Sequence, residues 1–151
     1  MPQMDIFHEV VKSALIKDGW TITHDPLTLS VGIRKVFIDL AGERLIAGEK
    51  NGEKIAVEVK SFLGRSDITE LERAIGQYVL YRRILREDEP ERKLYIAVEE
   101  ETYNGIFSEP IANWIVTDEQ INLIVFNAAK EEIIQWITET QTNTQILSRK
   151  S

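Results

Sequence analysis

The chain has no cysteine and only two histidines among its 151 residues. Without cysteine, disulfide bonds and thiolate zinc sites are excluded. The histidines, His8 and His24, are too few and too far apart in the sequence to suggest a histidine metal site, and His24 is expected in a turn. Neither residue type therefore indicates a metal centre.

The chain also lacks a long apolar run and an excess of basic residues. No run reaches the ~18 apolar residues needed to span a bilayer, and the start of the chain lacks the basic and apolar regions of a signal peptide. With the absence of cysteine, this favours a cytoplasmic protein with no membrane partner. The net charge of −7 argues against a protein that coats nucleic acid by charge alone. It leaves room for an enzyme that meets nucleic acid through a local patch and a metal ion.

The length and the pattern of apolar residues predict a single α/β domain, at the border with α+β, over residues 1–137, followed by a polar, frayed tail at 138–151. A central mixed β-sheet flanked by helices is expected, because helical and strand patterns alternate. The strand–helix–strand unit around the longest helix predicts two parallel strands. Helices are predicted at 5–18, 66–87 and 100–114, and strands at 20–23, 36–40, 44–50, 53–60, 93–98, 121–126 and 132–137.

Asn51-Gly52 is a strong signal for a two-residue hairpin turn between strands 44–50 and 53–60. This turn predicts that Lys50 faces Glu53 and that Leu45 faces Glu58. Just before this hairpin, Ala41-Gly42 is expected to loosen the chain as a bulge.

The strand at 55–60 carries an acid and a lysine two positions apart. Side chains alternate along a strand, so Glu58 and Lys60 share one face with Ala56. A carboxylate beside an ammonium can hold a divalent metal and steer a phosphate, which suggests a nuclease-type site. The alternative is that both are solvated side chains on an edge strand.

Metal-dependent phosphodiester hydrolysis needs a second carboxylate near the first. Asp39 is the leading candidate, because it lies in an apolar strand where an unpartnered acid is costly to bury. It is otherwise a turn residue at the end of a strand. Glu43 and Glu49 compete for the role, although Glu49 is expected in solvent near the turn.

Further polar residues on two predicted helices fit the same site. Gln77 and Tyr81 are four positions apart, so they share a face of the helix that follows the Glu58 strand. They are otherwise the polar margin of an amphipathic helix. Glu9 on the first helix offers another carboxylate, or is simply solvated.

Three tryptophans are expected in the core or an interface rather than as base-stacking platforms: Trp20, Trp114 and Trp136. Three arginines can touch phosphate or be ordinary surface residues: Arg65, Arg82 and Arg83.

The order of Asp39, Glu58-x-Lys60 and the Gln77 helix resembles the metal-dependent PD-(D/E)xK nuclease superfamily. More narrowly, residues 4–137 resemble the XisH family, the fdxN-element excision controlling factors of cyanobacteria. The long N-terminal match is the most specific part of this resemblance. The matching segments are Asp5–His8, Ala14–Pro26, Glu49-Lys50, Ile55–Phe62, Gly76-Gln77, Leu94-Tyr95 and Ala97-Val98.

The resemblance implies a restriction-endonuclease-like fold and a role in programmed excision of a DNA element. The resemblance implies that Asp39 and Glu58, at the motif positions of the superfamily, are ligands of Mg²⁺ or Mn²⁺, and that Lys60 is the catalytic lysine. The position before Asp39 holds Ile38, so the proline of the superfamily motif is absent. The supporting residues implied by the resemblance are Gln77, Tyr81 and Glu9.

Two hypotheses follow from the sequence. In the first, the protein is a Mg²⁺-dependent nuclease-like domain that binds DNA, and a homodimer suits a small domain that must meet both strands. In the second, it is a regulatory factor without turnover on a nuclease scaffold. Its acidic balance then favours a protein partner, such as another excision-control protein.

Overall fold

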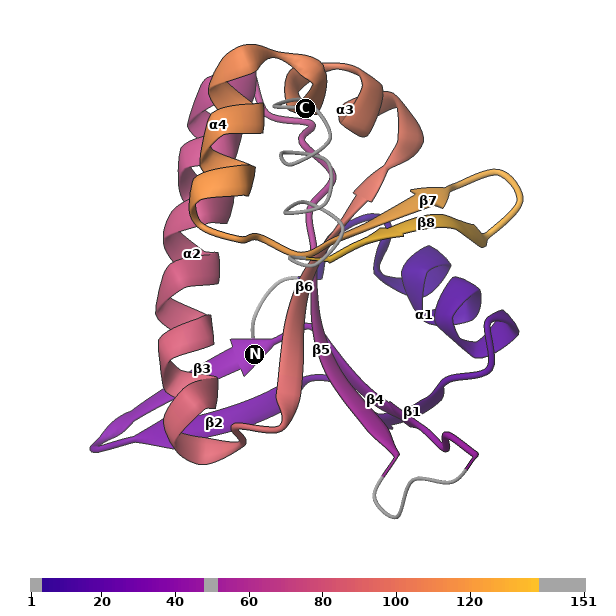
Figure 1. Ribbon diagram of the computed structural model, residues 1–151, viewed down its shortest axis with the longest axis vertical. Coiled ribbons are helices and arrows are strands. Elements are labelled where there is room, and N and C mark those ends of the chain that lie inside the picture. Colours follow the sequence, from indigo (N-terminus) through magenta and orange to yellow (C-terminus); the bar gives the residue numbers. More distant parts are fainter. Residues whose placement is uncertain (1–3, 48–51, 139–151) are drawn as a thin grey trace, which may run out of the picture.

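The computed structural model describes residues 4–47 and 52–138. Its strands are β1 Thr21–His24, β2 Leu27–Val31, β3 Arg34–Ile38, β4 Leu40–Arg44, β5 Glu53–Val59, β6 Arg92–Glu99, β7 Leu123–Asn127 and β8 Glu132–Ile137. Six of them form a central sheet in the order β1-β4-β5-β6-β7-β8, and β2 pairs with β3 in a separate sheet (Figure 1). β5, β6 and β7 run parallel, and the other neighbours are antiparallel, so the central sheet is mixed, as predicted.

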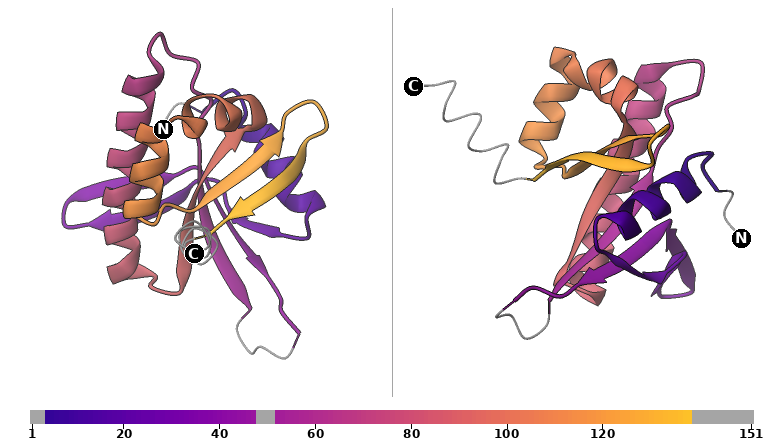
Figure 2. Two further views of the ribbon diagram at one scale, coloured as in Figure 1. Left: turned by 45° about the horizontal axis from the view of Figure 1, so that its top comes forward. Right: turned by 90° about the vertical axis from the view of Figure 1, so that its right-hand side faces the viewer.

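Helices lie on both faces of this sheet. They are α1 His8–Lys17, α2 Asp67–Asp88, α3 Glu100–Asn104 and α4 Pro110–Asp118, with a short 3₁₀ helix at Ile106–Ser108. Figure 2 shows α1 on one side of the sheet and the other helices on the opposite side. Across residues 4–47 and 52–138, no helix is both long enough and apolar enough to cross a membrane.

Strand alternation divides the core between the two faces of the sheet. On β5, Ile55, Val57 and Val59 pack with Val11 and Leu15 of α1. The opposite face carries a second apolar cluster with side chains of α2, α4 and the β2–β3 sheet. The predicted assignment of Ile55, Val57 and Val59 to one face is therefore confirmed, and it leaves Glu58 on the α2 side.

Helix α2 forms almost where the sequence predicts it. Ser66 is its N-cap, and its hydroxyl accepts a hydrogen bond from the Thr69 backbone N–H at 3.3 Å. Asp67 and Glu70 place negative charge in the first turn, where the helix dipole favours it. The helix joins β5 to the parallel strand β6, which confirms the predicted strand–helix–strand unit.

The predicted hairpin register is wrong. Arg44, not Lys50, faces Glu53, so the register differs from the prediction by six positions (50 − 44 = 6). The observed pairing places Leu40 opposite Val57, where both are fully buried, and leaves Leu45 89% exposed beyond the end of β4. Burial of apolar side chains therefore decides the register, and the connection after β4 is longer than a two-residue turn. Lys50 and Asn51 lie outside the described residues.

The predicted bulge lies on the neighbouring strand. β4 pairs evenly with β5 through Ala41 and Gly42. The irregularity is in β1, between Ile22 and His24. A Cβ at Gly42 would lie 3.1 Å from the Thr21 carbonyl oxygen, so glycine there permits the close approach of the two strands.

The three tryptophans differ in their surroundings. Trp20 is buried, and its ring lies 5.6 Å from that of the partly buried Trp136. Both therefore belong to the core, as expected. Trp114 on α4 is 67% exposed, so it is not a core residue. The weak helix predicted at 100–114 is divided into α3, the 3₁₀ turn and α4, which extends to Asp118.

Arg92, the first residue of β6, connects the strands beneath the end of α2. Its side chain is only 2% exposed, and a guanidinium nitrogen, Nη1, donates to the Ile55 carbonyl at 3.0 Å. The opposite nitrogen pairs with the Glu89 carboxylate at 3.0 Å. A buried cation with these partners leaves unmet polar groups when it is removed.

We expect Arg92→Ala to lower the free energy of unfolding by about 3 kcal/mol, because it leaves the buried Ile55 carbonyl and the Glu89 carboxylate without their partner. Urea denaturation measures the change. Arg83→Ala is the matched control, since Arg83 makes an exposed pair with Glu87 at 2.7 Å and its loss is expected to cost less than about 1 kcal/mol. Equal losses in the two variants would contradict the role given to Arg92.

Candidate functional site

Asp39 lies at the bend where the chain passes from β3 to β4. Both of its neighbours, Ile38 and Leu40, are fully buried and hold the bend against the core. The Asp39 Oδ2 accepts a hydrogen bond from the Val59 backbone N–H at 2.8 Å, and the Asp39 backbone N–H donates to Glu58 Oε1 at 3.0 Å. Asp39 is thus joined to the end of β5 by reciprocal hydrogen bonds, one with Val59 and one with Glu58, and the structure brings together the residues that the sequence predicts as a pair.

Glu58 and Lys60 stand at the end of β5, next to this bend. Glu58 is 7% exposed, and its Oε2 lies 3.6 Å from the Lys60 ammonium nitrogen. The Lys60 side chain remains 21% exposed, so it can reach a molecule in the adjoining cleft. Glu58 is therefore not a solvated residue of an edge strand, since β5 lies between β4 and β6.

Helix α2 provides the opposite wall of a cleft of about 560 Å³. Gln77 and Tyr81 both line it, together with Asp39, Glu58 and Lys60. Their i, i+4 spacing places them on the helix face that looks toward β5. The other lining residues are Met4, Asp5, Phe37, Val59, Glu70 and Arg73.

Gln77 holds a polar atom ready for a ligand. Its side-chain oxygen, Oε1, is buried, and it has no hydrogen-bond partner in the described part of the chain. An amide oxygen left unpaired in this way costs free energy unless water or a bound group satisfies it.

The surroundings of the acid pair raise both carboxyl pKa values. Burial raises the pKa of Glu58 to about 8, and the Asp39 charge adds to this effect while Lys60 opposes it. Burial also raises the pKa of Asp39, although the Val59 N–H and the positive groups nearby partly offset it. The pKa of Tyr81 is raised by burial and then by the charges of Glu58 and Asp39, which act on its hydroxyl.

This donor set fits a hard divalent cation. Asp39 and Glu58 supply carboxylate oxygens, and Gln77, which lines the same cleft, has a buried amide oxygen without a partner in the described part of the chain. Oxygen ligands of these kinds are the ones that Mg²⁺ and Mn²⁺ take in proteins. A cation between the acids would also offset the burial and the mutual repulsion that raise the pKa of Glu58.

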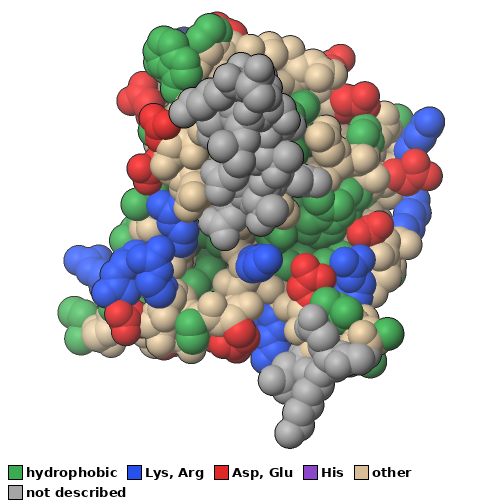
Figure 3. Space-filling view, viewed as in Figure 1, with side chains coloured by type: hydrophobic (Ala, Val, Ile, Leu, Met, Phe, Trp, Pro, Cys, Tyr) green, Lys and Arg blue, Asp and Glu red, His purple; other side chains and the backbone are tan. Residues whose placement is uncertain are grey.

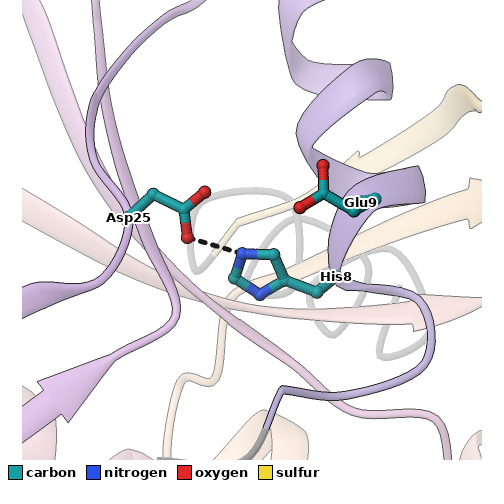
Figure 4. A group of neighbouring side chains, drawn as sticks. All are labelled: His8, Glu9 and Asp25. Carbon is teal, nitrogen blue, oxygen red and sulfur yellow. Dashed lines mark hydrogen bonds and ion pairs between the residues drawn. The ribbon is translucent and has the colours of Figure 1, made fainter. Parts of the chain in front are cut away.

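The other acids considered from the sequence lie elsewhere. Glu9 does not line the cleft, and its carboxylate lies beside His8 and Asp25 instead (Figure 4). Glu43 on β4 does not line the cleft either, and its side chain is 47% exposed opposite Lys54. Glu49 lies outside the described residues.

His8, Glu9 and Asp25 form a second acidic group, the one place in residues 4–47 and 52–138 where three possible ligand side chains come within 4.8 Å. The buried His8 Nε2 lies 2.6 Å from Asp25 Oδ1, and the Lys12 ammonium lies 2.7 Å from Asp25 Oδ2. Although burial acts to raise the pKa of Asp25, the hydrogen bonds from Lys12 and His8 lower it overall. Asp25 is thus already paired with the Lys12 ammonium and the His8 ring, and the group stabilises the start of α1 against the turn after β1.

Asp5 is a cleft residue that the sequence places only at the start of a helix. Its Oδ1 accepts from the Phe7 backbone N–H at 2.9 Å, which orders the turn before α1. Its Oδ2 accepts from the Ser61 backbone N–H, also at 2.9 Å, just beyond Lys60. No local pattern could reveal this contact, because it joins residues 56 positions apart.

Comparison with known proteins finds a matching family model and similar solved structures. A family model described as "XisH protein" matches residues 1–134. An XisH family protein from Nostoc punctiforme PCC 73102 is 46% identical, with a TM-score of 0.81, and an fdxN element excision controlling factor protein from Anabaena variabilis is 46% identical, with a TM-score of 0.79. In each case the match covers 89% of this chain and all of the solved structure. No curated protein matches the chain significantly.

The raised pKa of Glu58 predicts that stability falls as pH rises. The folded protein keeps a proton on Glu58 up to about pH 8, whereas the unfolded chain loses it near pH 4.5. The free energy of unfolding should therefore decrease as the pH rises from 4.5 to about 8 and stay low at higher pH. We expect Glu58→Gln, measured by urea denaturation in EDTA, to be more stable than wild type by about 5 kcal/mol at pH 9 and to lose this advantage near pH 4.5.

Glu87→Gln is the control for this experiment, because Glu87 is exposed and paired on the surface of α2. Its difference from wild type should change little with pH. If the difference between wild type and Glu58→Gln is constant across the range, Glu58 does not titrate as described.

Proposed function

The chain belongs to the XisH family, and on that premise we propose that it is a Mg²⁺- or Mn²⁺-dependent nuclease-like protein that binds DNA and acts in the excision of a DNA element. The observation that carries the proposal is the reciprocal hydrogen bonding of Asp39 with the end of β5, which sets two acids and Lys60 beside one cleft. Family membership supports a part in excision control, and the cleft supports the chemistry.

We extend the proposal to the fold superfamily. The acid at the start of β4, the acid-x-lysine at the end of β5 and the helix that crosses to β6 follow the order of the PD-(D/E)xK nucleases. Their fold is restriction-endonuclease-like. The mixed sheet with helices on both faces is compatible with it.

In this mechanism Asp39 and Glu58 hold the metal, with the Gln77 amide oxygen as a further donor. The bound metal would lower the pKa of a water molecule and stabilise negative charge on the scissile phosphate. Lys60, 3.6 Å from Glu58, is exposed enough to orient the attacking water or to neutralise the phosphate. Tyr81 lines the same cleft, and the charges of Glu58 and Asp39 act on its hydroxyl.

A single cleft of this kind hydrolyses one strand. A cut through both strands of a duplex therefore needs a second copy, and we include a homodimer on DNA in the proposal. The net charge of −7 makes metal and local contacts, rather than overall attraction, the basis of binding.

We expect wild-type protein to bind Mn²⁺ in calorimetry and to cleave at least one of duplex, nicked, branched or single-stranded DNA with Mg²⁺ or Mn²⁺. Asp39→Asn and Glu58→Gln should weaken Mn²⁺ binding more than about tenfold, because each removes a charged ligand. Lys60→Ala should leave Mn²⁺ affinity nearly unchanged and slow cleavage by about 100-fold.

Glu43→Gln and Glu9→Gln are the matched controls, since each removes one carboxylate outside the cleft. Both should bind Mn²⁺ and cleave as wild type does. Wild-type protein that binds no metal, or cleaves none of the four DNA forms, would reject the enzyme. Loss of Mn²⁺ binding in Glu43→Gln but not in Asp39→Asn would show that Glu43, rather than Asp39, is the second metal ligand.

A second function is favoured by the name of one relative, which is a controlling factor. In this alternative the protein has the same scaffold but no turnover, and it regulates excision by binding another excision-control protein. The acid pair would then serve a metal-dependent shape, and the acidic surface would meet a basic partner.

Affinity purification with and without nuclease treatment separates the two functions. For the regulatory factor, we expect a protein partner to be retained after nuclease treatment and Lys60→Ala to retain it as well. For the nuclease, partners should be lost when the DNA is digested. Retention of no partner under either condition would count against the regulatory function.

A further inference from the structure

A second cleft, which we call the basic cleft, lies between the C-terminal half of α2, the start of β6 and the connection from α4 to β7. Its volume is about 190 Å³. Four of its lining residues are cations and none is an acid, although the chain as a whole carries a net charge of −7. The lining residues are Tyr78, Arg82, Leu85, Arg86, Pro90, Arg92, Lys93, Leu94, Gln120 and Asn122.

Hydrogen bonds fix the floor of the basic cleft. The Tyr78 hydroxyl donates to the Leu94 carbonyl at 3.1 Å and accepts from the Asn122 backbone N–H at 3.1 Å. The Asn122 side-chain amide also donates to the Leu94 carbonyl, at 3.1 Å. These bonds connect α2, β6 and the residue before β7, so the cleft is part of the ordered core rather than a gap between loops.

The charges around the basic cleft leave it positive. Arg82 and Arg92 are paired with Glu119 and Glu89, respectively. In contrast, Arg86 and Lys93 are both exposed, and they have no acidic partner within 4 Å in the described part of the chain.

The neighbouring acids do not neutralise these two cations. Glu87 is paired with Arg83 at 2.7 Å, and Glu91 lies 3.6 Å from the Lys54 ammonium. Figure 3 shows Lys and Arg side chains gathered at the lower left of a surface that is otherwise mixed in charge.

We propose that the basic cleft binds a phosphate group of a nucleic-acid backbone, with Arg86 and Lys93 as its principal charged contacts. A guanidinium and an ammonium around one small cleft suit a phosphate, since both donate charge-assisted hydrogen bonds to its oxygens. The volume of about 190 Å³ equals that of about six water molecules, enough for a phosphate and part of its hydration. The cleft itself indicates that the ligand is a phosphate group. The inference that DNA supplies this phosphate rests on the proposed function.

The position of the basic cleft on α2 supports this source. Tyr81 lines the acidic cleft and Arg82, the next residue, lines the basic one, so the two clefts lie on faces of α2 about 100° apart. From Gln77 to Arg86 the helix rises about 14 Å, the axial length of about four base pairs. Nine residues turn the helix through about 900°, so Gln77 and Arg86 project from opposite sides of α2. A strand that passes around α2 can therefore have a phosphate at Arg86 and another phosphodiester near the acid pair.

The test compares wild type with the double variant Arg86→Ala/Lys93→Ala. The control, Lys17→Ala/Lys130→Ala, removes two exposed positive charges outside the basic cleft and gives the same net charge. Backbone amide NMR spectra are recorded in EDTA during titration with inorganic phosphate. Wild type and control should show saturable shifts at Lys93, Gln120 and Asn122, and the cleft variant should not.

A second arm measures binding of a fluorescent 20-base-pair duplex across a salt series, again in EDTA. The cleft variant should bind about tenfold more weakly than the control, and its slope of log affinity against log salt should fall by about 1 to 2. Phosphate shifts with equal duplex affinity in both variants would reject DNA as the source and leave a small-anion site. Absence of localised phosphate shifts, with both variants alike, would overturn the proposal. Both arms are run in EDTA, so the phosphate shifts and the duplex affinities would be the same if the proposed metal site does not exist.

Discussion

The exchange of hydrogen bonds between Asp39 and the end of β5 is the interaction on which the rest of the site depends. A carboxylate buried at a bend is costly unless its oxygens are satisfied, and the Val59 N–H satisfies one of them. The return bond from the Asp39 N–H orients Glu58, which in turn lies beside Lys60. One pair of bonds thus fixes the place where the small sheet meets the large one, and it also fixes the geometry of the cleft.

Helix α2 gives the molecule two clefts of opposite character. One face of the helix carries Gln77 and Tyr81 toward the buried Glu58 and the partly buried Asp39, and the adjacent face carries Arg82 and Arg86 toward a cleft without acids. Separation of charge in this way lets an acidic protein hold a cation and an anion on one rigid element. Nucleic acid needs both, because its phosphates require positive groups while its hydrolysis requires a metal between negative ones.

The parts of the fold that local chemistry determines could be predicted from the sequence. Helix α2 has a serine cap and regular apolar spacing, and β5 alternates strictly, so Glu58, Lys60, Gln77 and Tyr81 could be assigned to their faces. The hairpin register could not be predicted, because burial of Leu40 against Val57 outweighs the turn preference of Asn51-Gly52. Strand β2 was also missed, since its short alternating pattern is stabilised mainly by pairing with β3.

The contacts that assemble the cleft span long stretches of chain, and this bears on when the cleft can exist. Asp39 and Glu58 are 19 residues apart, and Asp5 reaches Ser61 across 56. Contacts of this separation form only after the intervening chain has closed into a loop, which slows folding. During synthesis, Asp5, the two acids and Lys60 emerge before the helix that contains Gln77 and Tyr81. In a nascent chain, the acids are therefore present before the helix that completes the cleft. The complete site exists only in the folded domain.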